Sequence, residues 1–174
     1  MERAVLLTGG NLGDVAANLR EAARRIAARV GCITARSRVY VSEPWGFEAP
    51  ERFLNQVLVV ETELSPGTLL ETVQRIEAEL GRERGGAPGY ASRTMDIDIL
   101  FYGNRVISTP RLTVPHPLLH ERMFVLEPLG EVLPALVHPL LGRTVAELRA
   151  DLEDRSERVA TEKDTNNRAE KGRD

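Results

Sequence analysis

The chain has 174 residues, a length that suits a single domain with a full-sized hydrophobic core. No apolar run approaches the ~20 residues of a membrane span, and the residues after Met1 lack the pattern of a signal peptide, so we expect a cytosolic protein. Because Cys32 is the only cysteine, an intrachain disulfide and a cysteine metal cluster are excluded. The net charge of −3 gives no basic field for nucleic acid, so any phosphate must be held by local arginines.

The N-terminal half predicts three strands and one helix. Strands are expected at 3–8, 32–41 and 53–64, and a helix at 15–30. Asp14 is a suitable N-cap for this helix, and Gly31 is a natural stop. Gly9 to Gly13 read as a tight loop before the helix; a structural turn is favoured there over a phosphate-binding loop, because P-loop and dinucleotide spacings are missing.

The C-terminal half begins with a second helix, which Ser65 caps, Pro66 opens and Gly81 ends. A glycine-rich loop at 82–92 then leads to a strand within the stretch 93–103, and Gly103-Asn104 predicts a hairpin into Val106-Ile107. Short helices are expected at 123–132 and 144–152. From Asp151 onward 14 of 24 residues are charged, which is typical of a disordered tail.

The order βαββαβ predicts an α+β fold, with helices packed on a mainly antiparallel sheet and an extra C-terminal hairpin and short helices. We expect one domain at 1–150, followed by the charged tail at 151–174. Such a pattern predicts a fold and carries no information on chemistry.

Two aspartates in the last predicted strand are the strongest chemical signal. Side chains alternate across a strand, so Asp96 and Asp98 share one face, opposite Ile97 and Ile99. Two neighbouring carboxylates repel each other unless a cation neutralises them, and Mg²⁺ prefers such oxygen ligands. Arg93, three residues upstream of Asp96, adds a possible phosphate contact. Taken alone, the pair fits a wet strand face better than a metal site.

Two further groups of residues are chemically informative. Phe53 and Asn55 share a strand face, where a ring can stack on a flat heterocycle and an amide can bind its edge; a core phenylalanine beside a turn asparagine is the simpler reading. Basic and hydroxyl groups flank the loops, where they could bind a polyphosphate or, more simply, complement a helix terminus; they are Arg82, Arg84, Arg111, Thr113, His116 and Arg122. His120 and His138 are expected to be structural.

Seven segments occur in the order found in 6-hydroxymethyl-7,8-dihydropterin pyrophosphokinases, and the chain resembles that family over about residues 3–150. They are 11–14 (NLGD), 40–46 (YVSEPWG), 53–55 (FLN), 74–77 (QRIE), 81–84 (GRER), 93–99 (RTMDIDI) and 111–117 (RLTVPHP). The resemblance implies a ferredoxin-like core and transfer of diphosphate from ATP to the pterin hydroxymethyl group, with release of AMP. It implies two Mg²⁺ ions bridging the aspartates and the triphosphate, and we expect a monomer.

Carried over to this sequence, the resemblance implies three sets of site residues. Asp96 and Asp98 would bind the metals and act with Arg84 and Arg93 in catalysis. From its residue type we also expect Asp98 to accept the hydroxyl proton, directly or through a metal-bound oxygen. The pterin would contact Ser42, Glu43, Pro44, Trp45, Phe53, Asn55, Asp96 and Phe124. ATP would contact Gln74, Glu77, Arg82, Arg84, Arg93, Ile99, Arg111, Thr113, His116 and Arg122.

Three other function classes stay open at this point. Another metal-dependent phosphotransferase or nucleotidyltransferase would use the same aspartate pair. A non-catalytic ferredoxin-like binding module has no evident need for that pair. A nucleic-acid reader fits least, given the net negative charge.

Overall fold

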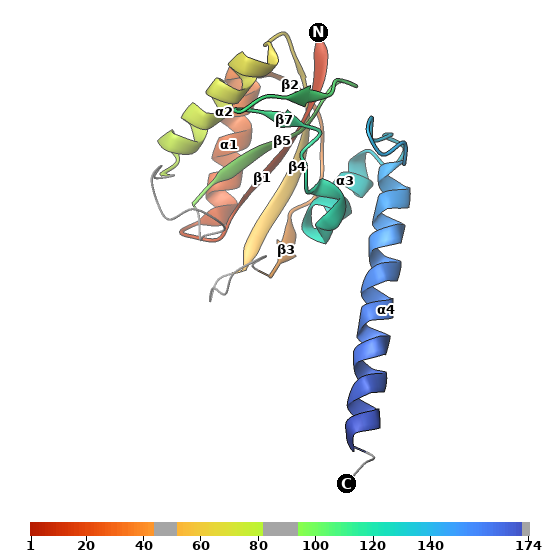
Figure 1. Ribbon diagram of the computed structural model, residues 1–174. Coiled ribbons are helices and arrows are strands. Elements are labelled where there is room, and N and C mark those ends of the chain that lie inside the picture. The colour runs from red at the N-terminus through yellow and green to blue at the C-terminus, as the bar shows by residue number, and fades with distance from the viewer. Residues whose placement is uncertain (44–51, 82–93, 172–174) are drawn as a thin grey trace.

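The computed structural model describes residues 1–43, 52–81 and 94–171, which form a five-stranded antiparallel sheet with helices on both faces (Figure 1). Its elements are β1 (Glu2–Gly10), α1 (Val15–Arg29), β2 (Gly31–Arg36), β3 (Tyr40–Ser42), β4 (Phe53–Thr62), α2 (Pro66–Glu79), β5 (Asp96–Tyr102), β6 (Ile107–Ser108), β7 (Thr113–Val114), α3 (Met123–Val132) and α4 (Val145–Lys171). The sheet order is β2-β4-β1-β5, and β3 also pairs with β4. This arrangement confirms the predicted α+β fold.

Two hydrophobic layers enclose the sheet because successive residues of its central strand face opposite sides. Ala4 and Leu6 of β1 pack with the apolar stripes of α1 and α2. Val5 and Leu7 pack on the other side with α3 and the start of α4. Figure 1 shows the two helix pairs on opposite sides of the sheet.

The predicted helix starts are confirmed. Asp14 accepts a hydrogen bond of 3.1 Å from the backbone N–H of Ala17 at the start of α1. Ser65 accepts one of 3.3 Å from the N–H of Thr68 at the start of α2. Such caps satisfy N–H groups that have no partner within the helix, so local sequence is enough to place them.

The strand predicted over 32–41 is divided into β2 and β3. Between them Ser37 still follows β4: its N–H donates to the carbonyl of Val57 at 2.9 Å, and its hydroxyl accepts from the N–H of Val57 at 3.0 Å. The side-chain oxygen therefore replaces one backbone acceptor of the ladder. That substitution interrupts the regular strand without moving the chain away from β4.

The hairpin predicted at Gly103-Asn104 is wrong in its placement. Gly103 makes the expected turn, with a φ of 54°, but β6 does not pair with β5. Instead β6 pairs with β7, and β7 lies beside β5. The extra hairpin therefore forms one element later than the turn signal indicated.

The charged segment from Asp151 is helical in the structure, which corrects the expectation of disorder. Helix α4 begins at a capping box: Thr144 accepts from the N–H of Glu147, and Glu147 accepts from the N–H of Thr144, both at 3.1 Å. Alternating charges then form pairs at i,i+4 spacing, such as Arg149–Glu153 at 3.2 Å, and stabilise the exposed helix. Figure 1 shows its C-terminal part extending away from the sheet. A domain boundary near residue 150 stays a prediction.

Within the described ranges, none of the helices combines the length and the apolar character that crossing a membrane requires.

Candidate active site

The two aspartates lie on the α3 side of the sheet, close to the first residues of β5. Asp96 pairs with Gly9 of β1, and Asp98 pairs with Leu7, so both carboxylates share the face of Leu7. Both residues are half-buried. The alternation predicted from the sequence is therefore confirmed, and the pair is a partly desolvated concentration of negative charge.

Asn55 occupies the same row of the sheet on the other side of β1, because it also pairs with Gly9. It is only 3% exposed, and its Nδ2 donates a hydrogen bond of 2.9 Å to the hydroxyl of Ser42 on β3. The row runs Asn55, Gly9, Asp96 across β4, β1 and β5. The structure thus brings a predicted pterin contact and a predicted metal ligand to one surface.

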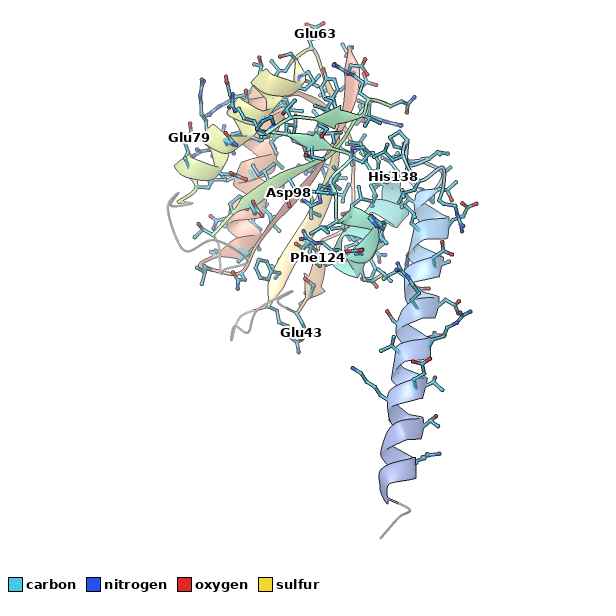
Figure 2. The ribbon with its side chains drawn as sticks, in the orientation of Figure 1. Glu43, Glu63, Glu79, Asp98, Phe124 and His138 are labelled. Carbon is cyan, nitrogen blue, oxygen red and sulfur yellow. The ribbon has the colours of Figure 1, made fainter. Side chains whose placement is uncertain are left out.

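Two aromatic rings belong to the same end of the molecule. Phe53 is half-buried and shares the strand face of Asn55. Phe124 is half-buried on α3, and α3 contacts both β3 and β4. Asp98 on β5 and Phe124 on α3 can be located in Figure 2. A sandwich of a flat ligand between the two phenylalanines stays a prediction.

Arg122 lies next to this group and carries a buried positive charge. Its guanidinium carbon is 5.6 Å from the centre of the Phe124 ring, and the residue is 5% exposed. Burial lowers the pKa of Arg122, although an arginine remains protonated in proteins. A cation in this position suits a phosphate or an electron-rich ring.

His116 is held in one orientation beside the aspartates. Its Nδ1 accepts a hydrogen bond of 3.2 Å from the N–H of Leu118, which leaves the ring proton on Nε2. Its own N–H donates to the carbonyl of Leu100 on β5 at 3.0 Å. Burial lowers the pKa of His116, and the nearby carboxylate of Asp96 opposes part of that shift. The imidazole therefore offers a neutral N–H donor at pH 7.

The predicted ATP contacts outside the loops gather around the outer edge of β5. Arg111 forms an ion pair of 3.6 Å with Glu71, which connects the hairpin to α2, the helix that carries Gln74. Thr113 on β7 is exposed, and β7 lies beside β5. Ile99 is 5% exposed with its side chain in the core, so only its backbone is available to a ligand.

Glu77 has a role that the sequence did not indicate. It is 3% exposed, and its carboxylate accepts a hydrogen bond of 2.7 Å from the backbone N–H of Ile97, between the two aspartates. This bond connects α2 to the strand of the two aspartates. The predicted contact of Glu77 with ATP stays a prediction.

Five predicted site residues lie outside the described residues: Pro44, Trp45, Arg82, Arg84 and Arg93. Glu43, just before the first gap, is exposed and forms an ion pair of 3.0 Å with Arg52 on its far side.

The donor set fits magnesium better than a metal that needs a complete protein cage. Among the residues that the structure describes, no three histidine, cysteine, aspartate or glutamate side chains are grouped to hold a metal ion. Mg²⁺ is commonly bound by one or two carboxylates and completed by water and substrate phosphates. Asp96 and Asp98 could provide that part of the coordination, with a nucleotide supplying the remainder.

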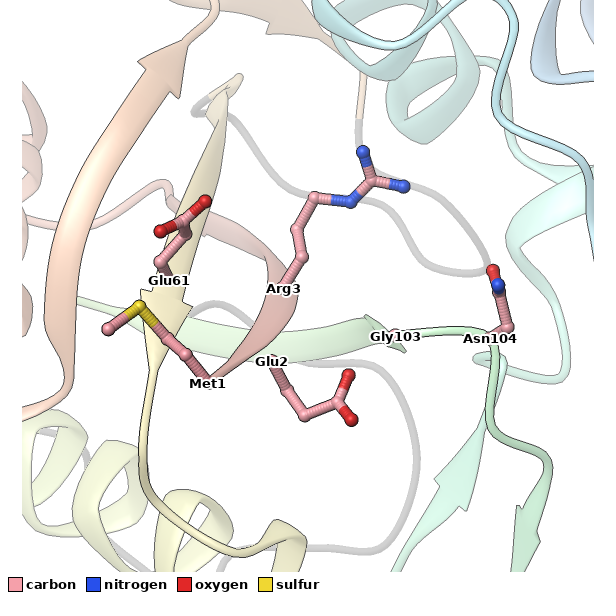
Figure 3. A pocket seen from close by; sticks show the side chains of 6 residues that line it. All are labelled: Met1, Glu2, Arg3, Glu61, Gly103 and Asn104. Atoms are coloured by element: carbon pink, nitrogen blue, oxygen red, sulfur yellow. The ribbon is translucent and has the colours of Figure 1, made fainter.

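A separate hollow of about 410 Å³ lies at the opposite end of β1 (Figure 3). It is lined by Met1, Glu2, Arg3, Glu61, Gly103 and Asn104. It contains no aromatic side chain, and its two carboxylates belong to different strands. The hollow lacks the features of the aspartate end and is not the candidate site.

Gly9 lies between Asn55 and Asp96 in the candidate site, and the sequence motifs did not identify it as a site residue. The sequence predicts a loop from Gly9, but β1 continues to Gly10. A glycine within a strand often marks a close approach of neighbouring groups, and that signal was available.

Comparison with known proteins identifies relatives of this chain. A model of the family described as 7,8-dihydro-6-hydroxymethylpterin-pyrophosphokinase (HPPK) matches residues 5–134. The chain is 44% identical over 154 residues to the 2-amino-4-hydroxy-6-hydroxymethyldihydropteridine pyrophosphokinase of Methylorubrum extorquens, covering 88% of this chain and 95% of that protein. It is 40% identical over 130 residues to the protein of the same name from Bacillus subtilis, covering 74% and 77%.

Solved structures show the same fold. The Plasmodium falciparum HPPK-DHPS triple mutant with SDX-DHP matches with a TM-score of 0.70 at 17% identity, covering 86% of this chain and 44% of that chain. An HPPK-DHPS in complex with substrates matches with a TM-score of 0.71 at 16% identity, covering 90% and 44%. This chain thus spans less than half of those proteins, and the likeness concerns the fold alone. Together with the sequence matches, it places the chain in the 7,8-dihydro-6-hydroxymethylpterin-pyrophosphokinase family.

Proposed function

We propose that the aspartate end of the sheet transfers the terminal diphosphate of ATP to the hydroxymethyl group of 6-hydroxymethyl-7,8-dihydropterin, releasing AMP, as a step of folate biosynthesis. The observation that carries this proposal is the row formed by Asn55, Gly9 and Asp96, with Asp98 on the same face. It joins an amide suited to a heterocycle edge with carboxylates suited to a polyphosphate–metal complex. A binding module without catalysis would have no use for the carboxylate pair.

The pterin would lie on the sheet between β4 and β5. Asn55 and the segment from Ser42 to Trp45 would bind its polar edge, while Phe53 and Phe124 would stack on its faces. The buried position of Asn55 and its bond to Ser42 support this arrangement, since a fixed amide discriminates between hydrogen-bond patterns.

The nucleotide would lie along the outer edge of β5. The N–H of Ile97 faces that edge, since it donates to Glu77, and the alternation of a strand directs the backbone of Ile99 the same way. Ile99 would therefore bind the base through its backbone, beside Thr113 and the neutral N–H of His116. Gln74 and Arg111 would complete the sugar and phosphate contacts, together with Arg82 and Arg122.

Catalysis would rest on positioning and on charge neutralisation. Asp98 would accept the proton of the attacking hydroxyl, which attacks the β-phosphorus in line as AMP leaves. Arg84 and Arg93 would bind the non-bridging oxygens, where negative charge is concentrated. Mg²⁺ at the two aspartates, as two ions in this proposal, would supply further neutralisation of the triphosphate. We also propose that the chain acts in the cytosol as a monomer.

Incubation with ATP, Mg²⁺ and 6-hydroxymethyl-7,8-dihydropterin tests the proposal. We expect AMP as the nucleotide product, formed only when the pterin is present. ADP would identify a phosphotransferase of another type, and failure to bind ATP with Mg²⁺ would favour a binding module.

A further inference from the structure

Gly9 occupies the centre of the row between Asn55 and Asp96. We propose that Gly9 is a specificity-determining residue: its missing side chain leaves the space that holds the Asn55 carboxamide in the position from which it binds the pterin. The inference rests on the proposed pterin site and adds to it a residue that makes no polar contact of its own.

Backbone conformation does not explain a glycine at this position. The glycines with positive φ in the described chain are Gly13, Gly81, Gly103 and Gly142, and Gly9 is not among them. It is a regular strand residue that pairs on both sides, so alanine could adopt its conformation. A glycine within a strand is moderately destabilising. The reason for a glycine here must therefore lie in the atoms that occupy the position of a side chain.

That space is taken by Asn55. A Cβ atom built on Gly9 would lie 2.5 Å from Oδ1 of Asn55 and 3.4 Å from its Cγ, with the carbonyl oxygen of Leu54 at 3.1 Å. The first distance is shorter than any real Cβ contact, so the carboxamide would have to move. Its position is otherwise fixed by the hydrogen bond from Nδ2 to Ser42 on the opposite side. Gly9 and Ser42 thus hold the amide from its two ends.

The consequence for a ligand follows from the geometry of the row. Oδ1 of Asn55 projects over β1, toward β5 and Asp96. Asn55 and Asp96 flank Gly9 and are two strand spacings apart, roughly 10 Å. A flat fused heterocycle held between Phe53 and Phe124 could span that distance, with its N–H donors at Oδ1 and its hydroxymethyl group at the aspartates. A methyl group on Gly9 would displace the acceptor Oδ1.

The test is Gly9→Ala, with Gly67→Ala as the matched control. A Cβ on Gly67, in the first turn of α2, would meet nothing within 4 Å. We expect Gly9→Ala to raise KM for the pterin about tenfold or more, the size typical of losing a specific polar contact, while KM for ATP changes less than about twofold. Gly67→Ala should leave both values unchanged. An unchanged pterin KM in Gly9→Ala, or an equal rise for ATP, would overturn the inference.

A double-mutant cycle with Asn55→Ala separates this role from general packing. Once the carboxamide is removed, the added methyl group has nothing to displace, so Gly9→Ala should raise the pterin KM less than about twofold further. Equal effects in both backgrounds would contradict the proposal. If Gly9→Ala folds only together with Asn55→Ala, the steric conflict is supported; failure to fold in both backgrounds overturns it. Wild-type protein that forms no AMP would overturn the proposed function along with this inference.

Discussion

The carboxylate of Glu77 accepts a hydrogen bond of 2.7 Å from the backbone N–H of Ile97, the residue between the two aspartates. This contact joins the last turns of α2 to the first residues of β5. At the same place Gly81, just past α2, lies close to Thr94, just before β5: a Cβ on Gly81 would be 3.5 Å from Oγ1 of Thr94. These two contacts hold the end of α2 beside the start of the strand that carries Asp96 and Asp98.

Replacing Glu77 tests this positioning role. Glu77→Ala leaves the N–H of Ile97 buried without its acceptor, so we expect a loss of about 1–3 kcal/mol in the free energy of unfolding and a lower kcat. Glu77→Gln keeps an oxygen acceptor of the same length and should retain most of both. Urea unfolding and steady-state kinetics measure the two effects. If Glu77→Gln lost ATP affinity while the fold kept its stability, the predicted contact with ATP would be correct instead.

Asp98→Asn should abolish most of the turnover. The amide cannot accept the hydroxyl proton and is a weaker metal ligand, so we expect kcat to fall by about three orders of magnitude. Binding of the pterin, which relies on Asn55 and the aromatic rings, should change little in calorimetry. Turnover near the wild-type value would exclude Asp98 from catalysis.

We expect the buried imidazole of His138 to make the folded state less stable in acid. It is 3% exposed, and its Nδ1 accepts from the N–H groups of Leu140 and Leu141 at 3.2 and 3.1 Å. Burial, and to a smaller extent His120, lower its pKa below the ordinary value of 6.5. In the pH range between the two pKa values, the unfolded chain binds more protons than the folded one. The contribution of neutral His138 to the free energy of unfolding is therefore complete above about pH 6.5 and is lost as the pH falls toward the folded-state pKa.

The corresponding measurement is urea unfolding at pH 7.5 and 5.5. In His138→Asn, Oδ1 of the asparagine can replace Nδ1 as an acceptor, and the new side chain does not titrate. The decrease in unfolding free energy between the two pH values should be smaller in this variant than in wild type. His116, whose pKa is also lowered, contributes with the same sign and remains in both proteins. An identical decrease would show that His138 does not titrate in this range.

The distal part of α4 should be dispensable for catalysis. Among the side chains of α4 that the structure describes, Leu148 is the last that is buried, and Leu152 is the last that packs against the core. A chain ending at Asp154 should keep wild-type kcat and KM, and should lose helical signal in circular dichroism in proportion to the residues removed. A large drop in Tm or activity would show that the exposed helix has a partner within the fold.

Local signals in the sequence were sufficient for features that depend on neighbouring residues. The caps at Asp14 and Ser65 and the shared face of Asp96 and Asp98 follow from spacing alone. The hairpin after Gly103 could not be placed in this way, because β5 pairs with β1, nearly a hundred residues earlier in the chain, rather than with β6. Composition also failed for α4, whose alternating charges form ion pairs along one helix.

The candidate site shows the same difference between features that depend on neighbouring residues and features that depend on long-range pairing. Asn55 and Asp96 were identified from their motifs, but their common neighbour Gly9 could be found only from the register of three strands. The contact of Glu77 with ATP is implied by the family resemblance; its burial and its bond to Ile97 depend on how α2 packs beside β5. Long-range pairing and helix packing are properties of the folded chain that no window of the sequence contains.

Phosphorus NMR of the complete reaction tests the central claim most directly. With ATP, Mg²⁺ and 6-hydroxymethyl-7,8-dihydropterin, the account predicts one AMP and one pterin diphosphate ester for each ATP consumed, and no such ester with Asp98→Asn. Formation of ADP, or of AMP with free pyrophosphate and no pterin ester, would contradict it.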